Sequence, residues 1–308
     1  MDIFSSTLNQ TMFLFSLIAI GYILAKCKII PEASSEVLAK LENMVFVPGL
    51  ILSTFIENFT VERISSAWKL LLVSGIILAV MIPAAILISK CFAKDKYTQN
   101  IYTYGLIFSN FGFMGNAVVS ALFPDIFFEY IIFVLPLWIM IYLWAVPCLL
   151  IADSGKQSIR QRLKAFANPM FVAMLIGIIV GLLNIKLPTF INSTVEASGN
   201  CMSPVAMILT GITVSKINLT KTFTNLKIYA VSIIRLVILP LVFIGISKFI
   251  LFEHTVFVCA LCSLAMPLGL NTVVIPGAYG KDTSVAAGMA LISHLLSCIT
   301  LPFVFSLI

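Results

Sequence analysis

Apolar residues fill long stretches of this 308-residue chain, and short polar segments separate one stretch from the next. A helix needs about 20 mostly apolar residues to cross a bilayer, and ten stretches approach or reach that length. They lie near residues 6–25, 36–57, 68–89, 100–123, 127–152, 169–187, 195–216, 226–250, 255–279 and 283–307. The pattern predicts an all-α polytopic membrane protein with ten transmembrane helices.

The two halves of the chain repeat the same landmarks at nearly one offset. Offsets between 155 and 158 residues relate Pro31 to Pro188, Pro48 to Pro204, Pro83 to Pro240, Ser89-Lys90 to Ser247-Lys248, and Asn116 to Asn271. Each half then holds five spans, and because five is odd, the second half must enter the membrane from the opposite side. We therefore expect a first five-helix repeat at 1–152, a cytoplasmic linker at 153–168 and a second, inverted repeat at 169–308.

Spans four and nine each contain an interruption, at corresponding places in the two halves. The first is Ser109–Asn116 and the second is Met266–Thr272. Glycine and proline weaken a helix, and opened backbone inside a membrane is tolerated only where protein or a water-filled cavity surrounds it. Paired interruptions of this kind are the best sequence indication of a transporter's binding site.

Two broken helices from inverted halves are expected to cross with their N-terminal half-helix ends facing one point. Such ends carry free N–H groups and partial positive charge, which suits a carboxylate or a similar anion. Asparagine amides can add donors or acceptors there. The alternative is that these amides only satisfy the opened backbone; we favour the binding role for Asn110 and Asn271 and leave both roles open for Asn116. The candidate substrate-binding residues are Asn110, Gly112, Gly115, Asn116, Pro267, Gly269, Asn271 and Thr272.

Charged and titratable residues inside the spans are few. Arg235, five residues before Pro240, could attract an anionic substrate and is kept as a candidate binding residue. We favour a structural role, in which its side chain reaches a membrane edge or pairs with carbonyls freed by Pro240. His294 is interpreted as a hydrogen-bonded core histidine in preference to a proton relay. Glu57 is the acidic residue nearest to mid-membrane, and Glu42 should lie at a membrane edge or in a protein-lined cavity.

The composition excludes a soluble globular protein, because 60% of the residues are hydrophobic, 10% are charged and the mean hydropathy is +1.10. Cys259 and Cys262 are interpreted as small core residues, so we expect neither a metal nor a cofactor. Zinc-protease, P-loop and nucleophile-elbow motifs are missing, so we do not expect an enzyme. The net charge of +6 belongs to the loops and does not suggest a nucleic-acid partner.

Loop charge sets the expected orientation. The loops after spans one, three, five, seven and nine hold thirteen Lys and Arg residues, whereas the opposite face holds four. Cytoplasmic loops carry such an excess. Both termini should then lie outside the cytoplasm and the basic linker inside, in the plasma (inner) membrane. The first apolar stretch lacks a basic leader and is expected to be a membrane helix.

Several stretches, in their order and spacing, resemble the auxin efflux carrier family, which includes bacterial malate and malonate permeases and the plant PIN auxin exporters. They are Ser109–Gly115, Asn168-Pro169, Ser203-Pro204 to Gly211, Ala265–Pro267 with Asn271, and Tyr279–Asp282. The resemblance implies two inverted five-helix repeats with crossed broken helices four and nine. It also implies a scaffold from spans 1, 2, 6 and 7 and a transport domain from spans 3–5 and 8–10, an architecture shared with the bile-acid sodium symporters. Ala117 stands where the family usually has proline, so the first interruption is less strongly encoded.

The implied function is secondary active transport, or facilitated passage, of a small organic anion by alternating access, with an elevator-like or rocking motion. Mono- and dicarboxylates and auxin-like acids all fit. The alternatives are a sodium-coupled symporter of the bile-acid type and, further off, a channel-like or sensory membrane protein. Coupling to H⁺, to Na⁺ or to neither stays open, as does a homodimer formed through the scaffold domain.

Overall fold

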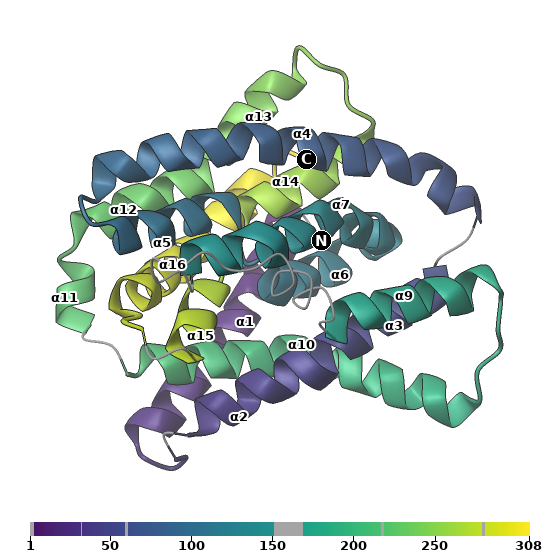
Figure 1. Ribbon diagram of the computed structural model, residues 1–308, viewed down its shortest axis with the longest axis horizontal. Helices are drawn as coiled ribbons and strands as arrows, with labels where there is room; N and C mark the ends of the chain where they lie inside the picture. Colours follow the sequence, from purple (N-terminus) through teal and green to yellow (C-terminus); the bar gives the residue numbers. More distant parts are fainter. Residues whose placement is uncertain (1–2, 32, 59–60, 151–168, 217–218, 279–280) are drawn as a thin grey trace.

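The computed structural model describes residues 3–31, 33–58, 61–150, 169–216, 219–278 and 281–308 (Figure 1). These ranges hold helices and their connections, and one antiparallel bridge is the only β-pairing within them. The all-α prediction is therefore confirmed for the part of the chain that is described. The predicted linker at 153–168 and the side chain of Glu57 lie outside it.

The first half of the chain contains helices α1 to α7, with π-helical and 3₁₀ segments labelled η. They are α1 (Ile3–Lys26), α2 (Ser34–Leu41), η1 (Glu42–Phe46), α3 (Val47–Asn58), α4 (Val61–Phe92), α5 (Lys96–Ile107), η2 (Phe111–Gly115), α6 (Asn116–Leu122), η3 (Pro124–Ile126), α7 (Phe127–Met140) and η4 (Ile141–Leu150).

The second half continues with helices α9 to α16. They are α9 (Pro169–Leu182), α10 (Thr189–Val214), α11 (Leu219–Phe223), α12 (Leu226–Ile233), η5 (Ile234–Ile238), α13 (Leu239–Ser247), α14 (His254–Ala265), α15 (Asn271–Ala278) and α16 (Ser284–Phe305).

Seven helices in the described residues are long and apolar enough to cross a membrane. Three further apolar helices are shorter: Phe111–Leu122, Val172–Leu182 and His254–Ala265. Two of these three flank the interruptions predicted in spans four and nine, where the chain leaves the helical conformation before a span is complete. Large apolar side chains stay exposed on α1, α4, α9 and α13, as expected for surfaces that face lipid.

Close helix contacts at glycine hold α1, α3, α9 and α10 together. A Cβ atom on Gly211 of α10 would lie 1.9 Å from the Ile18 carbonyl oxygen of α1, so only glycine lets these two backbones approach so closely. A Cβ on Gly177 of α9 would lie 2.6 Å from the Phe55 Cβ of α3. Figure 1 shows α2, α3, α9 and α10 along one side of the molecule and α4, α12 and α13 along the other.

The most deeply buried helices lie between these two sides. Eight of the twelve residues of α5 are buried, and every residue from Ile101 to Val119 is buried. The chain is buried again from Val258 to Leu270. The two predicted interruptions therefore lie in the interior of the protein, which is where opened backbone can be satisfied away from lipid.

Candidate functional site

The first interruption follows α5. The helix ends at Ile107, and Phe108 takes an extended conformation with φ −105° and ψ 104°. The chain becomes helical again at Phe111, where η2 runs directly into α6. The first carbonyl that accepts inside this new helix belongs to Asn110, so the N–H groups of residues 111–113 precede the hydrogen-bond ladder.

The second interruption follows α14, which ends at Ala265. Met266 is extended with ψ 148°, and α15 starts at Asn271. Proline has no N–H group, so Pro267 cannot donate to the carbonyl of Ser263 four residues earlier. The carbonyls at the end of α14 and the N–H groups at the start of α15 are thereby released from helical pairing.

The two interruptions are hydrogen-bonded to each other. The Asn110 N–H donates to the Pro267 carbonyl (2.7 Å), and the Gly269 N–H donates to the Phe108 carbonyl (3.3 Å). Ser109 and Leu268 form the antiparallel bridge between them. We call residues 108–110 and 266–270 the junction. Because the pairing is antiparallel, the start of η2 contacts α14 and the start of α15 contacts α5. The N-terminal ends of η2 and α15 carry partial positive charge.

Gly269 is required for this close approach. A Cβ atom at this position would lie 2.9 Å from the Phe108 carbonyl oxygen and 3.1 Å from that of Ser109. Both atoms belong to backbone, which cannot rotate away as a side chain can. The glycine in the second interruption therefore serves the contact between the two segments.

Arg235, in η5, lies behind the junction with its side chain fully buried. Its Nη1 donates to the Leu106 carbonyl (2.9 Å), its Nη2 to the Ser263 carbonyl (2.8 Å) and its Nε to the Met266 carbonyl (3.4 Å). Leu106 and Ser263 are 157 residues apart, the offset that also relates Pro31 to Pro188. One guanidinium thus binds equivalent carbonyls from the ends of α5 and α14.

This arrangement changes the interpretation of Arg235. Its partners are carbonyls, as the structural interpretation expects, but they belong to the two interruptions and not to the backbone near Pro240. The buried side chain does not reach a membrane edge. The guanidinium lies against the C-terminal ends of α5 and α14, which carry partial negative charge.

Asn110 is buried and paired with His294 of α16, with 2.9 Å between Asn110 Nδ2 and His294 Nε2. His294 Nδ1 lies 2.7 Å from the Ala290 carbonyl, which can only accept, so Nδ1 carries the imidazole proton. Nε2 is then the acceptor and the asparagine amide donates to it. The Asn110 Oδ1 atom has no partner, so Asn110 has an acceptor to offer a ligand while its amide nitrogen is engaged.

The other two asparagines differ from Asn110. Asn271 is half-buried, and its Nδ2 donates to the Tyr104 hydroxyl (3.1 Å). Asn116 begins α6, is buried, and has an Oδ1 atom without a partner. Thr272 donates its hydroxyl to the Gly269 carbonyl (2.8 Å) at the start of α15. The predicted residues therefore gather around the junction, but only some present free polar atoms.

Gly112 and Gly115 lie against aromatic side chains of α7. A Cβ on Gly112 would lie 2.9 Å from the Trp138 ring, and one on Gly115 would lie 2.2 Å from the Tyr130 hydroxyl oxygen. That hydroxyl donates to the Phe111 carbonyl (3.1 Å). The two glycines thus let α7 support the first interruption, a role the sequence interpretation did not assign to them.

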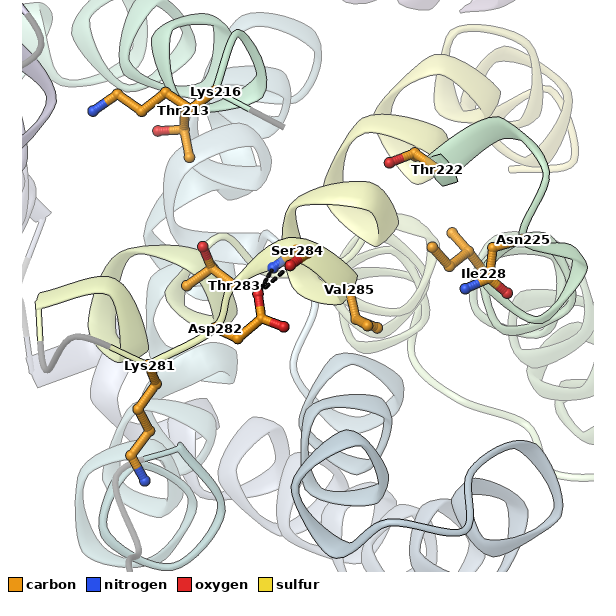
Figure 2. A pocket seen from close by; sticks show the side chains of 10 residues that line it. All are labelled: Thr213, Lys216, Thr222, Asn225, Ile228, Lys281, Asp282, Thr283, Ser284 and Val285. Atoms are coloured by element: carbon orange, nitrogen blue, oxygen red, sulfur yellow. Dashed lines mark hydrogen bonds between the residues drawn. The ribbon is translucent and has the colours of Figure 1, made fainter. Parts of the chain in front are cut away.

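A cavity of about 610 Å³ is lined by residues outside the junction (Figure 2). Its lining comes from the end of α10, from α11 and α12, and from the start of α16: Thr213, Lys216, Thr222, Asn225, Ile228, Lys281, Asp282, Thr283, Ser284 and Val285. Figure 2 shows the Lys216 and Lys281 side chains extending away from Asp282. Lys216 donates to the Ser35 hydroxyl, and Lys281 lies over the Tyr97 ring.

Asp282 occupies the start of α16 within this cavity. Its Oδ1 accepts from the Ser284 N–H (2.9 Å) and from the Ser284 hydroxyl. These hydrogen bonds hold the pKa of the Asp282 carboxyl below its usual value. The carboxylate satisfies one of the N–H groups that a helix start leaves free, and it partly offsets the two lysines.

Several contributors at the junction were not predicted from the sequence. Tyr104, Tyr130 and Ser263 lie in apolar spans, and nothing in the sequence pattern distinguishes them from their neighbours. Ser293 accepts from the Leu268 N–H (3.1 Å), and no motif marks it.

Glu42 was expected at a membrane edge or in a protein-lined cavity. It is fully buried in η1, and neither carboxyl oxygen has a partner among the described residues.

Comparison with known proteins adds a family match. The model of a family described as membrane transport protein matches residues 6–161 and 157–305. A protein from Methanothermobacter thermautotrophicus, named an uncharacterized transporter, is 25% identical over 320 residues, and the match covers 97% of this chain and 98% of that protein.

Proposed function

Because this chain belongs to the membrane transport protein family, the auxin efflux carrier family that its sequence resembles, we propose that it carries a small organic anion across the plasma membrane. The cargo is a mono- or dicarboxylate or an auxin-like acid. Carriage proceeds by alternating access, as secondary active transport or as facilitated passage. The protein acts as a transporter and not as an enzyme.

The observation that carries this proposal is the hydrogen-bonded meeting of two interrupted helices in the protein interior. Each N-terminal half-helix end is equivalent to roughly half a positive charge and suits a carboxylate, and the starts of η2 and α15 supply one such end on each side of the junction. Arg235 supports this field indirectly, because it binds the opposing carbonyl ends. We therefore assign Arg235 a positioning role and leave direct contact with the anion to the N-terminal ends.

The residues proposed to bind the anion surround these ends. The N–H groups of residues 111–113 precede the ladder of η2, and Asn271 and Thr272 begin α15. Asn110 and Asn116 contribute unpaired amide oxygens, which accept hydrogen bonds. A carboxylic anion that also bears a hydroxyl or another donor group would satisfy both kinds of partner.

The proposed motion separates two groups of helices. Scaffold spans 1, 2, 6 and 7 correspond to α1, α2–α3, α9 and α10, and the remaining spans form the transport domain. Thr213 of the cavity lies in the scaffold helix α10 and Lys216 follows it, whereas Thr222, Asn225 and residues 281–285 belong to the transport side. We propose that this cavity is the cytoplasmic entrance between the two domains, with both chain termini on the opposite face.

Uptake into proteoliposomes tests the proposed function. The purified protein is reconstituted, and entry of radiolabelled acetate, malonate, succinate and indole-3-acetate is followed with and without proton and sodium gradients. Saturable uptake of at least one anion, competed by unlabelled substrate, is expected. Flux that rises linearly with concentration would indicate a channel, and the absence of flux for every anion would reject the proposal.

Orientation has its own test. A single cysteine in residues 153–167, on a background without the seven native cysteines, should react with a membrane-impermeant reagent only after the cytoplasmic face is opened. A cysteine next to either terminus should react from outside. Labelling of the linker from outside alone would reject both the inverted repeat and the orientation.

A further inference from the structure

We propose that Arg235 is a built-in counter-cation that takes the place of a sodium ion at the junction, so that the protein moves its anion without sodium. The inference rests on the proposed function of the junction as the anion site. The sequence leaves coupling to H⁺, to Na⁺ or to neither open, and this inference excludes coupling to Na⁺.

The oxygen atoms around Arg235 are of the kind that a small hard cation binds. Hard cations take several converging oxygen ligands, and backbone carbonyls released from a helix supply them. Three such carbonyls, those of Leu106, Ser263 and Met266, converge on the guanidinium at 2.8 to 3.4 Å. A side chain of the protein itself therefore occupies the position where carbonyls from both interrupted helices meet.

The charge of Arg235 is offset by helix ends. The salt bridges among the described residues join Lys40 to Glu36 and Lys69 to Glu253, so no carboxylate pairs with Arg235 there. The C-terminal end of a helix is equivalent to roughly half a negative charge, and the ends of α5 and α14 together match one guanidinium. An arginine stays protonated and cannot leave the protein, so this positive charge is permanent.

Three other junction carbonyls are also engaged. The Phe108 carbonyl accepts from Gly269, and the Pro267 carbonyl accepts from Asn110. The Gly269 carbonyl accepts from the Thr272 hydroxyl. These hydrogen bonds leave the carbonyls of Phe108, Pro267 and Gly269 less available to a cation.

Leu78 stands at the first-half position that corresponds to Arg235, 157 residues earlier, and it is buried. The first repeat thus supplies no second cation. One arginine binds the carbonyl ends of both repeats, and because it is fixed to η5, a sodium gradient has no ion to move through this position.

Ion replacement on the wild-type protein is the first test. Anion uptake is measured in proteoliposomes in sodium buffer and in choline buffer of equal ionic strength, with the proton gradient clamped. The expected rates agree, whereas a sodium-coupled carrier should lose at least about tenfold in choline. Such a loss would overturn the inference and leave the proposed transport intact. Lack of saturable uptake in both buffers would instead contradict the proposed function.

Chemical rescue is the second test. Arg235→Ala leaves three carbonyls without their cation, so methylguanidinium, and to a lesser degree sodium, should raise the melting temperature of this variant by about 3 °C or more. The wild type and Lys248→Ala, which removes an exposed charge from the end of the same span, should not respond. Arg235→Ala that transports like the wild type and responds to neither cation would overturn the inference. If Arg235→Ala does not fold, Arg235→Lys takes its place, and its sodium-dependent uptake would overturn the inference equally.

Discussion

The two interruptions that meet at the junction reach similar geometry by different means. The second interruption is caused by its own residues. Pro267 has no N–H to donate to the Ser263 carbonyl, and Gly269 lets the Phe108 carbonyl approach. The first contains no proline, and side chains of α7 and α16 surround it instead. Tyr130 and His294 bind the Phe111 carbonyl and the Asn110 amide, respectively. A weakly encoded break can thus be held by its neighbours.

Glycine substitutions should have the largest effects, and they should distinguish the interruption caused by its own residues from the one held by side chains of other helices. Gly115→Ala brings a Cβ against the Tyr130 hydroxyl, and Gly269→Ala brings one against backbone at Phe108, so overpacking should lower stability by about 2 and about 3 kcal/mol, respectively. Tyr130→Phe should restore part of the loss in Gly115→Ala but none in Gly269→Ala. Thermal unfolding in detergent measures all four variants.

Gly75→Ala is the matched control, because a Cβ at Gly75 meets nothing within 4 Å. It should leave the melting temperature unchanged or raise it slightly, as alanine favours a helix over glycine. Equal rescue of both junction variants by Tyr130→Phe would show that the two interruptions do not differ in the way described.

Asparagine substitutions come next in size. Asn110→Ala should weaken anion binding by about 1–3 kcal/mol, roughly tenfold to a hundredfold, because a buried amide with a free oxygen is lost. Asn271→Ala should cost less, since Asn271 is half-buried and its amide also serves Tyr104. Asn110→Leu should lower anion affinity more than Asn110→Ala, because the leucine side chain would also fill space next to the bound anion. Calorimetry on purified protein measures the affinities.

The two alanine effects should be non-additive if both asparagines hold one anion. Asn192→Ala, at an exposed position of α10, is the control and should bind like the wild type. Wild-type affinity in both junction variants, with both well folded, would place the anion elsewhere.

His294→Ala should have a smaller effect, confined to the first interruption. Without the Nε2 acceptor, the Asn110 amide is free to rotate, and we expect a loss of about 1 kcal/mol in anion affinity. The loss should vanish when Asn110 is already alanine. His254→Ala, the exposed second histidine, serves as the control. An undiminished loss in the Asn110→Ala background would mean that His294 acts independently of Asn110.

The smallest effect is expected at the start of α16, which supports both interruptions through Ser293 and His294. Asp282→Ala removes an exposed helix-start acceptor and should lower stability by about 0.5 kcal/mol. Because the folded-state pKa of Asp282 is lowered, its contribution is present above the usual pKa and is lost as the pH falls through the folded value. Melting curves of wild type and variant should therefore converge in acid, whereas Asp125→Ala should follow the wild type throughout.

Sequence patterns predicted where the helices break but not what holds the breaks. Glycine, proline and asparagine in an apolar run are visible locally, and the breaks at 108–110 and 266–270 overlap the predicted interruptions. The prediction was too long for the first one, because the chain is helical again from Phe111 through Asn116. The partnership of Asn110 with His294 joins positions 184 residues apart, and periodicity does not reveal which helix faces meet over such separations. The sequence left Glu42 either at a membrane edge or in a protein-lined cavity, and periodicity could not decide, since its burial depends on neighbouring helices and not on its own segment.

The backbone bridge at the junction also has a mechanical consequence. Pulling α5 away from α14 would break the two backbone hydrogen bonds and the arginine contacts together, where no water is at hand to replace them. An isolated broken helix can act as a hinge, but these two breaks are fastened to each other and to η5. Bending costs less in exposed connections such as residues 248–253, which precede α14 and whose backbone can bond to water. The helices joined at the junction should therefore move as one rigid body during transport. The backbone conformation should change in the connections that flank this rigid body.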